Sequence, residues 1–384
     1  MSLLTLPPLS LYVHVPWCVR KCPYCDFNSH ERNDLPVKEY LAALLEDLQY
    51  DLHLVQGRKL QTIFFGGGTP SLMPGSFYRQ LLNALRQQIE FSPDIEITLE
   101  ANPGTVEQGR FEEYRAAGIN RLSIGVQSFN AAHLQKLGRI HSNDEATRAA
   151  QAARNAGFDN YNLDLMHALP EQSTAQALDD LSQAIALAPS HISWYELTIE
   201  PNTSFFNQPP AQPDLDDMAE TEEAGFALLA QHGYQRYEIS AFAQPDRAAR
   251  HNLNYWHFGD YLALGAGAHG KITLPKSGDI LRYQKTRQPE AYLSEQGSRS
   301  RQPHMVAPPE RPIEYFLNTL RLIQGSPMEN FTLRTGVSME HISPVLEQLK
   351  SERLLSLDGL RIKCSELGIR HLNTVLERLE TAIK

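Results

Sequence analysis

Three of the four cysteines lie within eight consecutive positions of the chain. They are Cys18, Cys22 and Cys25, spaced as Cys-x3-Cys-x2-Cys, whereas Cys364 lies far away near the C-terminus. Inert buried cysteines would not be expected to cluster in this way, and a redox pair would need only Cys22 and Cys25. The spacing therefore predicts a metal site, with Cys364 as a small residue of the core.

Two kinds of metal site fit the three thiols. A structural zinc ion needs a fourth ligand, which His14 or His30 could supply. A 4Fe-4S cluster held by three thiolates keeps one iron open, and an open iron is a place for chemistry. The cysteines by themselves leave both alternatives open.

The elements that must position the thiols follow an alternating pattern. Amphipathic stretches such as 39–55 and 173–187 have apolar residues at three- and four-residue steps, as in helices. Between such stretches, strands are expected at 11–15, 62–65, 96–99, 121–126, 162–166 and 192–197. Six strand–helix units predict an α/β fold in which a parallel sheet curls into a partial (β/α)6 barrel.

The active site of such a barrel lies at the carboxyl ends of its strands. The first three predicted strands are followed by the cysteines, by three glycines at 66–68 and by Glu100. Gln127 follows the fourth strand, Asp164 lies within the fifth and Thr198 ends the sixth. This ring of polar groups favours a reactive cluster over a zinc knuckle.

The glycine run lets the main chain approach a ligand closely, with a tight strand-to-helix turn as the alternative. No Gly-Lys-Ser/Thr follows it and Gly-x-Gly-x-x-Gly is not matched, so it is neither a Walker loop nor a dinucleotide fingerprint.

Composition narrows the class of protein. The chain has 384 residues, 42% of them hydrophobic, which is enough for one large and one smaller core. The net charge of −10 and the lack of basic runs make nucleic acid an unexpected partner. No stretch reaches the roughly 18 apolar residues of a membrane span, and no signal peptide is evident, so the cytoplasm is the expected location.

The motifs resemble the radical S-adenosylmethionine (SAM) superfamily. Its cysteine spacing is present, with the aromatic Tyr24 before the third cysteine and GGGTP after the second strand. The runs YVHVPWC, FGGGTPS, LEANPG, SIGVQSF, LGRIHS, NLDLMHALP and LTIEP resemble the branch shared by oxygen-independent coproporphyrinogen III dehydrogenases and HemW heme chaperones. The resemblance covers nearly the whole chain.

This resemblance implies a 4Fe-4S cluster on the three cysteines and SAM bound to the open iron. In the superfamily, an electron from the cluster cleaves SAM to a 5′-deoxyadenosyl radical, while the protein supplies position. Tyr12, Gly67 and Glu100 are implied to line the cluster-bound SAM. The positions matching a second SAM in the dehydrogenase branch are Tyr24, Gly68, Thr69, Gln127, Arg139, Asp164 and Thr198.

Two departures from the dehydrogenases speak against porphyrinogen decarboxylation. Those enzymes have a fourth cysteine two places after the third, where this chain has Phe27, and they have a long segment before Tyr12, where this chain has eleven residues. The run HNLNYW at 251–256 instead resembles the HNxxYW signature of HemW proteins. It makes His251 the candidate heme ligand, while Tyr255 and Trp256 would either stack on a macrocycle or serve as core aromatics.

The resemblance therefore implies a heme chaperone that passes heme to acceptor proteins, with membrane respiratory enzymes among the candidates. A radical SAM oxidoreductase acting on a tetrapyrrole is the alternative. A peripheral position at the inner face of the membrane is compatible with the first function.

Three parts of the chain are expected. They are the barrel at 1–240, an extension with the HNxxYW run at 241–304 and a winged-helix-like helical domain at 305–384. The proline-rich stretch 305–312 predicts a linker, followed by helices over 312–325, 339–357 and 366–383 around a short strand at 360–363. Without a basic face, this last unit is expected to be a lid or a protein-contact module.

Overall fold

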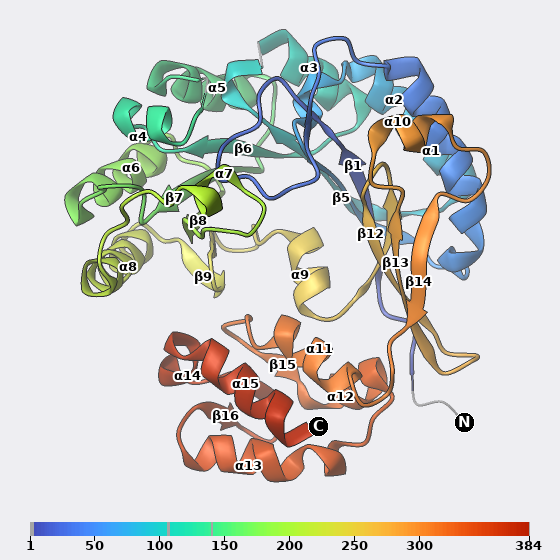
Figure 1. Ribbon diagram of the computed structural model, residues 1–384, viewed down its shortest axis with the longest axis vertical. Coiled ribbons are helices and arrows are strands. Elements are labelled where there is room, and N and C mark those ends of the chain that lie inside the picture. Colours follow the sequence, from blue (N-terminus) through green and yellow to red (C-terminus); the bar gives the residue numbers. More distant parts are fainter. Residues whose placement is uncertain (1–3, 106–107, 140, 384) are drawn as a thin grey trace.

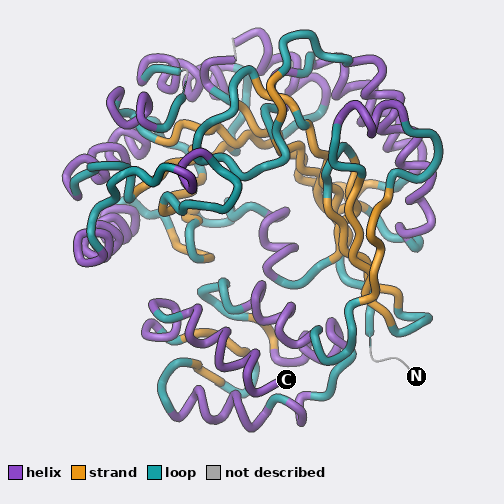
Figure 2. The backbone as a smooth tube through the Cα atoms, viewed as in Figure 1, coloured by secondary structure: helices purple, strands orange, loops and turns teal. Residues whose placement is uncertain are grey.

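A curved 12-stranded sheet organises the computed structural model, which describes residues 4–105, 108–139 and 141–383. The strand order is β14-β13-β12-β11-β1-β4-β5-β6-β7-β8-β10-β9. The neighbours from β11 to β8 in this order are parallel, and the strands beyond them at both edges are antiparallel. Figure 2 shows the strands as one curved layer with most helices on its outer side.

The parallel strands are β1 (Leu9–Val15), β4 (Leu60–Gly67), β5 (Phe91–Ala101), β6 (Arg121–Gln127), β7 (Tyr161–His167), β8 (His191–Glu196) and β11 (Asp260–Leu264). The antiparallel strands of this sheet are β9 (Gln235–Glu238), β10 (Ala241–Ala243), β12 (His269–Leu274), β13 (Asp279–Lys285) and β14 (Ser300–Met305). All six predicted strands are thus confirmed. The segment expected as an extension adds strands to the same sheet, because β11 pairs with β1.

Helices α1 to α8 follow the strands of the first 235 residues. They are α1 (Val37–Asp51), α2 (Gly75–Gln88), α3 (Gln108–Ala117), α4 (Ala131–Lys136), α5 (Asn143–Asn155), α6 (Thr174–Ala186), α7 (Ser204–Asn207) and α8 (Leu215–Gln231), with short 3-10 turns at Leu52–Val55, Pro70–Leu72 and Pro103–Thr105. Helix α9 (Arg250–Trp256) lies on the concave side of the sheet, and α10 (Pro289–Ser294) lies beside α1 (Figure 1). The parallel strands are buried almost throughout because helices cover their outer face.

The C-terminal unit has its own apolar cluster. Its elements are α11 (Arg311–Thr319), β15 (Ser326–Pro327), α12 (Met328–Thr335), a 3-10 turn at Met339–His341, α13 (Ser343–Ser351), β16 (Leu355–Leu357), β17 (Arg361–Cys364), α14 (Glu366–Arg370) and α15 (Leu372–Ile383). Ile280 of β13 and Phe258, which lies between α9 and β11, join this cluster, so the two parts pack against each other. Within the described ranges, no helix is long and apolar enough to cross a membrane.

Three sequence expectations for this unit need correction. The predicted linker is not free, since Val306 is buried and its N–H donates to Ile280 O at 2.8 Å. The helix predicted over 339–357 ends at Ser351, and Leu355–Leu357 pairs with β17 as a strand. Helix α12 was not predicted, although Gly336 in the left-handed conformation (φ 72°) ends it in the usual way.

One buried ion cluster ties the added strands to the barrel. Lys285 Nζ on β13 donates at 2.7 Å to both Asp47 Oδ1 and Asp51 Oδ2 of α1, and the Lys285 side chain has no exposed surface. Removing one member of such a cluster leaves the other charges buried without a partner.

We expect Lys285→Met to lower the free energy of unfolding by about 3–5 kcal/mol, because it leaves two buried carboxylates unpaired. The matched control is Lys350→Met, whose exposed pair with Glu347 should contribute less than about 1 kcal/mol. Denaturant titrations of both variants measure the difference, and equal stabilities would contradict this account.

Candidate functional site

The cysteine loop is fixed at both of its ends. It follows the carboxyl end of β1. Its first residues form β2 (Trp17–Cys18), its last form β3 (His30–Glu31), and these two short strands pair in parallel. Trp17 is fully buried and meets the Tyr40 ring edge-on, with 4.7 Å between the centroids. The loop therefore presents its thiols from an anchored base.

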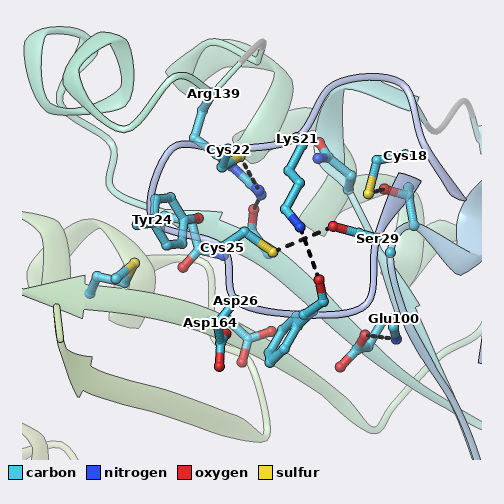
Figure 3. A pocket seen from close by; sticks show the side chains of 18 of the residues that line it. Cys18, Lys21, Cys22, Tyr24, Cys25, Asp26, Ser29, Glu100, Arg139 and Asp164 are labelled. Atoms are coloured by element: carbon cyan, nitrogen blue, oxygen red, sulfur yellow. Dashed lines mark hydrogen bonds between the residues drawn. The ribbon is translucent and has the colours of Figure 1, made fainter. Parts of the chain in front are cut away.

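All three thiols face one pocket, and each has a polar neighbour (Figure 3). Thr69 Oγ1 donates to Cys18 Sγ at 3.4 Å, Arg139 Nη1 donates to Cys22 Sγ at 3.7 Å, and Cys25 Sγ lies 3.7 Å from the Ser29 hydroxyl. Burial raises the pKa of both Cys18 and Cys25. Burial thus favours the protonated form of the Cys18 and Cys25 thiols, and all three sulfurs have neighbouring groups of the kind that donate to cluster-bound thiolates.

His14 is not free to complete a zinc site. Its Nε2 donates to Asn28 O at 2.9 Å, so its Nδ1 accepts from the Tyr12 hydroxyl at 2.9 Å. Burial lowers the pKa of His14 to about 4, which keeps the ring neutral. Among the described residues, no three His, Cys, Asp or Glu side chains are grouped to hold one metal ion. His14 is thus a poor fourth ligand for a closed Cys3His site, and the other candidate, His30, has its Nε2 3.1 Å from Asn28 Oδ1.

The glycine run at the end of β4 is required by the protein itself. Gly67 has φ +119°, and a Cβ there would lie 2.6 Å from the His14 ring. A Cβ at Gly68 would lie 2.6 Å from Trp17 O and 3.0 Å from Cys18 Sγ. The tight-turn interpretation therefore accounts for both glycines, and the turn also brings the main chain to the pocket.

Two half-buried carboxylates face the thiols from the sheet (Figure 3). Glu100 Oε2 accepts from Gly67 N at 3.1 Å, and burial, reinforced by Asp164, raises the pKa of Glu100 to about 8. Burial also raises the pKa of Asp164, although Ser123 and Asn162 donate to it at 2.8 Å. A cation beside them would favour the ionised form of both carboxyl groups.

Gln127 shows backbone strain at the end of β6. Its φ of +70° is unusual for a residue with a side chain, and the pairing of β6 with β7 shifts register there. The Tyr195 hydroxyl donates to Gln127 Oε1 at 2.7 Å and fixes this amide at the pocket wall. Such strain is typical of functional positions.

The pocket has a volume of about 500 Å³ and brings together all the residues predicted for the cluster and SAM except Tyr12. Those are Cys18, Cys22, Cys25, Tyr24, Gly67, Gly68, Thr69, Glu100, Gln127, Arg139, Asp164 and Thr198. Sequence reasoning missed Ser123, Gly125 and Tyr195, which also line it. Their signal was their position near the carboxyl ends of predicted strands.

Tyr12 lines a second pocket that adjoins the first. Both pockets include Asp26, Phe27, Gly67 and Glu100 in their walls. Tyr12 is therefore near Glu100, but it faces the other side of the shared wall.

His251 lies in neither pocket. It is 1% exposed, packed against Phe64 with ring centroids 5.0 Å apart. The Thr62 hydroxyl donates its proton to Ser10, so Thr62 Oγ1 can only accept from His251 Nδ1, at 2.7 Å. The other ring nitrogen, Nε2, therefore accepts from the Tyr255 hydroxyl at 2.6 Å. Both ring nitrogens are thus engaged, and the role of His251 as an iron ligand remains a prediction that this geometry does not favour.

Comparison with known proteins agrees with this architecture. Residues 12–184 match the model of the radical SAM superfamily, and residues 306–371 match that of the HemN C-terminal domain. A solved structure described as coproporphyrinogen III oxidase (HemN) from Escherichia coli, a radical SAM enzyme, superposes with a TM-score of 0.82 at 24% identity, covering 98% of this chain and 91% of that one. The chain thus has the radical SAM fold.

Curated relatives identify the family within this superfamily. The heme chaperone HemW of Escherichia coli (strain K12) is 49% identical over 97% of this chain and 98% of its own length. The heme chaperone HemW of Haemophilus influenzae is also 49% identical, and that of Bacillus subtilis is 33% identical over 90% of this chain and 92% of its own length. The chain belongs to the HemW family.

We expect Cys18→Ala, Cys22→Ala or Cys25→Ala each to abolish the oxygen-sensitive visible absorption of a 4Fe-4S cluster after anaerobic reconstitution, because three thiolates are the minimum for this motif. Cys364→Ala is the control, since Cys364 lies in the C-terminal apolar cluster and should leave the absorption unchanged. Stoichiometric zinc without sulfide in the parent protein would contradict the cluster assignment.

Proposed function

We propose that this protein is a heme chaperone that carries a 4Fe-4S cluster and SAM, binds heme and passes it to acceptor proteins. The relatives with the highest identities above are named as heme chaperones, and their similarity covers nearly the whole chain. The observation that carries the proposal is the pair of adjoining pockets, one lined by three thiols and the other by aromatic rings.

The first pocket suits a cationic cofactor. SAM has a sulfonium and an ammonium group, and such charges would favour the ionised form of the two half-buried carboxyl groups, Glu100 and Asp164. Arg139 also lines the pocket, where Nη2 donates to Gly125 O at 2.5 Å and Nη1 donates to Cys22 Sγ at 3.7 Å, and the positive charge of this guanidinium suits a cofactor carboxylate. The cofactors supply electron transfer and radical chemistry, while these side chains bind and orient them.

Phe27 distinguishes this protein from the tetrapyrrole dehydrogenases that the sequence resembles. It stands where they have a further cysteine, is 58% exposed and lines both pockets. An exposed aromatic ring between a cofactor pocket and an aromatic pocket suits contact with a flat apolar ligand better than redox chemistry of its own. This residue favours heme carriage over porphyrinogen oxidation.

The proposal includes acceptors among membrane respiratory enzymes and attachment to the inner face of the membrane during transfer. The C-terminal unit would serve as the protein-contact module, because its apolar cluster includes Phe258 and Ile280 and its Asn318 lines the second pocket.

The deciding experiment uses anaerobically purified full-length protein with measured iron, sulfide and heme content. We expect Soret absorption on hemin addition and transfer of that heme to an apo-hemoprotein, without oxidation of coproporphyrinogen III. Turnover of coproporphyrinogen III coupled to SAM consumption would favour the alternative function, a radical SAM oxidoreductase.

Proton release from Glu100 gives a second test of the proposed function. The pKa of about 8 keeps Glu100 mostly protonated at pH 7, and a bound cation would lower that pKa, so SAM binding should release up to about one proton from it. Above this pKa the carboxyl is already ionised and the release should vanish. The number of protons released is measured from the change in apparent binding enthalpy between buffers of high and low ionisation enthalpy.

The Glu100→Gln variant should not show this proton release on SAM binding. Glu377→Gln, at an exposed position, should release protons like the parent protein. Identical proton release from the parent protein and Glu100→Gln would exclude Glu100 as a contact of the cation.

A further inference from the structure

The second pocket has the size and the walls of a site for a flat, apolar molecule. Its volume is about 690 Å³, within the roughly 300–1,000 Å³ of small-molecule sites. Five aromatic rings line it, from Tyr12, Phe27, Tyr255, Trp256 and Tyr261. They come from β1, the cysteine loop, α9 and β11, on the concave side of the sheet (Figure 1).

These aromatic walls are held in place by the protein. The Tyr255 and Tyr261 rings meet edge-on with centroids 4.5 Å apart, and the Tyr261 hydroxyl accepts from Arg282 Nη1 at 2.7 Å. Outside the pocket, His251 accepts from the Tyr255 hydroxyl and stacks on the Phe64 ring. The wall is therefore formed before any ligand arrives, and His251 contributes to it from outside the pocket.

One imidazole in the pocket wall is available to a metal. His269 begins β12, is exposed, and makes no side-chain hydrogen bond to any residue that the structure describes. Burial, then the charges of Arg282 and Arg287, lower the pKa of His269, which favours the neutral ring that binds iron. His14 lines the same pocket, but hydrogen bonds occupy both of its nitrogens.

One guanidinium in the wall lacks an acidic partner. Arg287 is exposed, and its only side-chain hydrogen bond within the described part of the chain runs from Nε to Asn28 Oδ1 at 3.4 Å. No ion pair of the described residues includes it, whereas nearby Arg282 pairs with Glu314 at 2.7 Å. A guanidinium without an ion-pair partner is suited to bind a carboxylate of a ligand.

We propose that this second pocket is the heme site, with His269 as the iron ligand and Arg287 as the partner of a heme propionate. This assignment rests on the proposed function. It combines the three features that heme requires, namely aromatic faces for the macrocycle, a free neutral imidazole for iron and a free cation for the carboxylates. His251 is then a positioning residue that holds Tyr255.

The ligand test is a hemin titration of the cluster-loaded full-length protein. His269→Ala should weaken hemin binding at least about tenfold and change the Soret band, because one metal–ligand bond is lost. Added imidazole should restore the parental spectrum in His269→Ala by filling the vacant position. The exposed His371→Ala in the C-terminal unit is the control and should bind like the parent protein.

The propionate test uses hemin and hemin dimethyl ester. Arg287→Gln should weaken hemin binding severalfold and leave dimethyl ester binding unchanged, since the ester has no charge for the guanidinium to bind. Arg79→Gln, at an exposed position of α2, is the matched control and should change neither. Cluster content and near-UV circular dichroism verify that each variant is folded.

The outcomes separate this inference from the proposed function. If the parent protein binds no hemin, both fail. If it binds hemin and His269→Ala gives the parental spectrum and affinity, the site assignment is overturned and the heme function stands. Loss of the axial ligand signal in a folded His251→Ala, with rescue by imidazole there and not in His269→Ala, would return the ligand role to His251.

Discussion

The close approach of three strand ends, β4, β1 and β11, determines the geometry of both pockets. Side chains cannot fit between them, since a Cβ at Gly67 would lie 2.6 Å from the His14 ring and one at Gly265 would lie 2.3 Å from His14 O. A Cβ at Gly267 would meet the Asn28 side chain at 2.2 Å. Glycines from the strands on both sides thus hold the end of β1 and the cysteine loop that follows it. The two glycine-rich runs of the sequence serve one packing constraint.

Hydrophobic runs and motif spacing were sufficient to predict the barrel and most of the first pocket. The six buried parallel strands appear in the sequence as apolar runs. Their carboxyl ends lie at one edge of the sheet, which is where active sites form in such folds. The place of β11 in the sheet was not predicted, because its pairing with β1 depends on a contact between residues about 250 positions apart, and β12 to β14 then follow it as consecutive antiparallel strands. Local periodicity carries no information on such a contact.

The same limit explains why Tyr12 does not line the first pocket. Tyr12 and His14 alternate with the core residues Leu11 and Val13 along β1, so they face the concave side that the added strands enclose. The HNxxYW run forms a short helix, and its two halves differ in environment: His251 is buried, while Trp256 reaches the pocket. A motif identifies which residues matter, but only the packing shows which of them a ligand could touch.

The wall between the pockets gives a physical route for one ligand to affect the other. Glu100 belongs to both pockets, and its charge depends on its surroundings because burial raises its pKa to about 8. A cation in the first pocket would ionise Glu100 and add a negative charge to the wall of the second. A flat apolar ligand in the second pocket would exclude water from the same wall and favour the neutral carboxyl. The occupants of the two pockets would thus both act on the protonation of one shared carboxyl group, which makes Glu100 the physical link between the pockets.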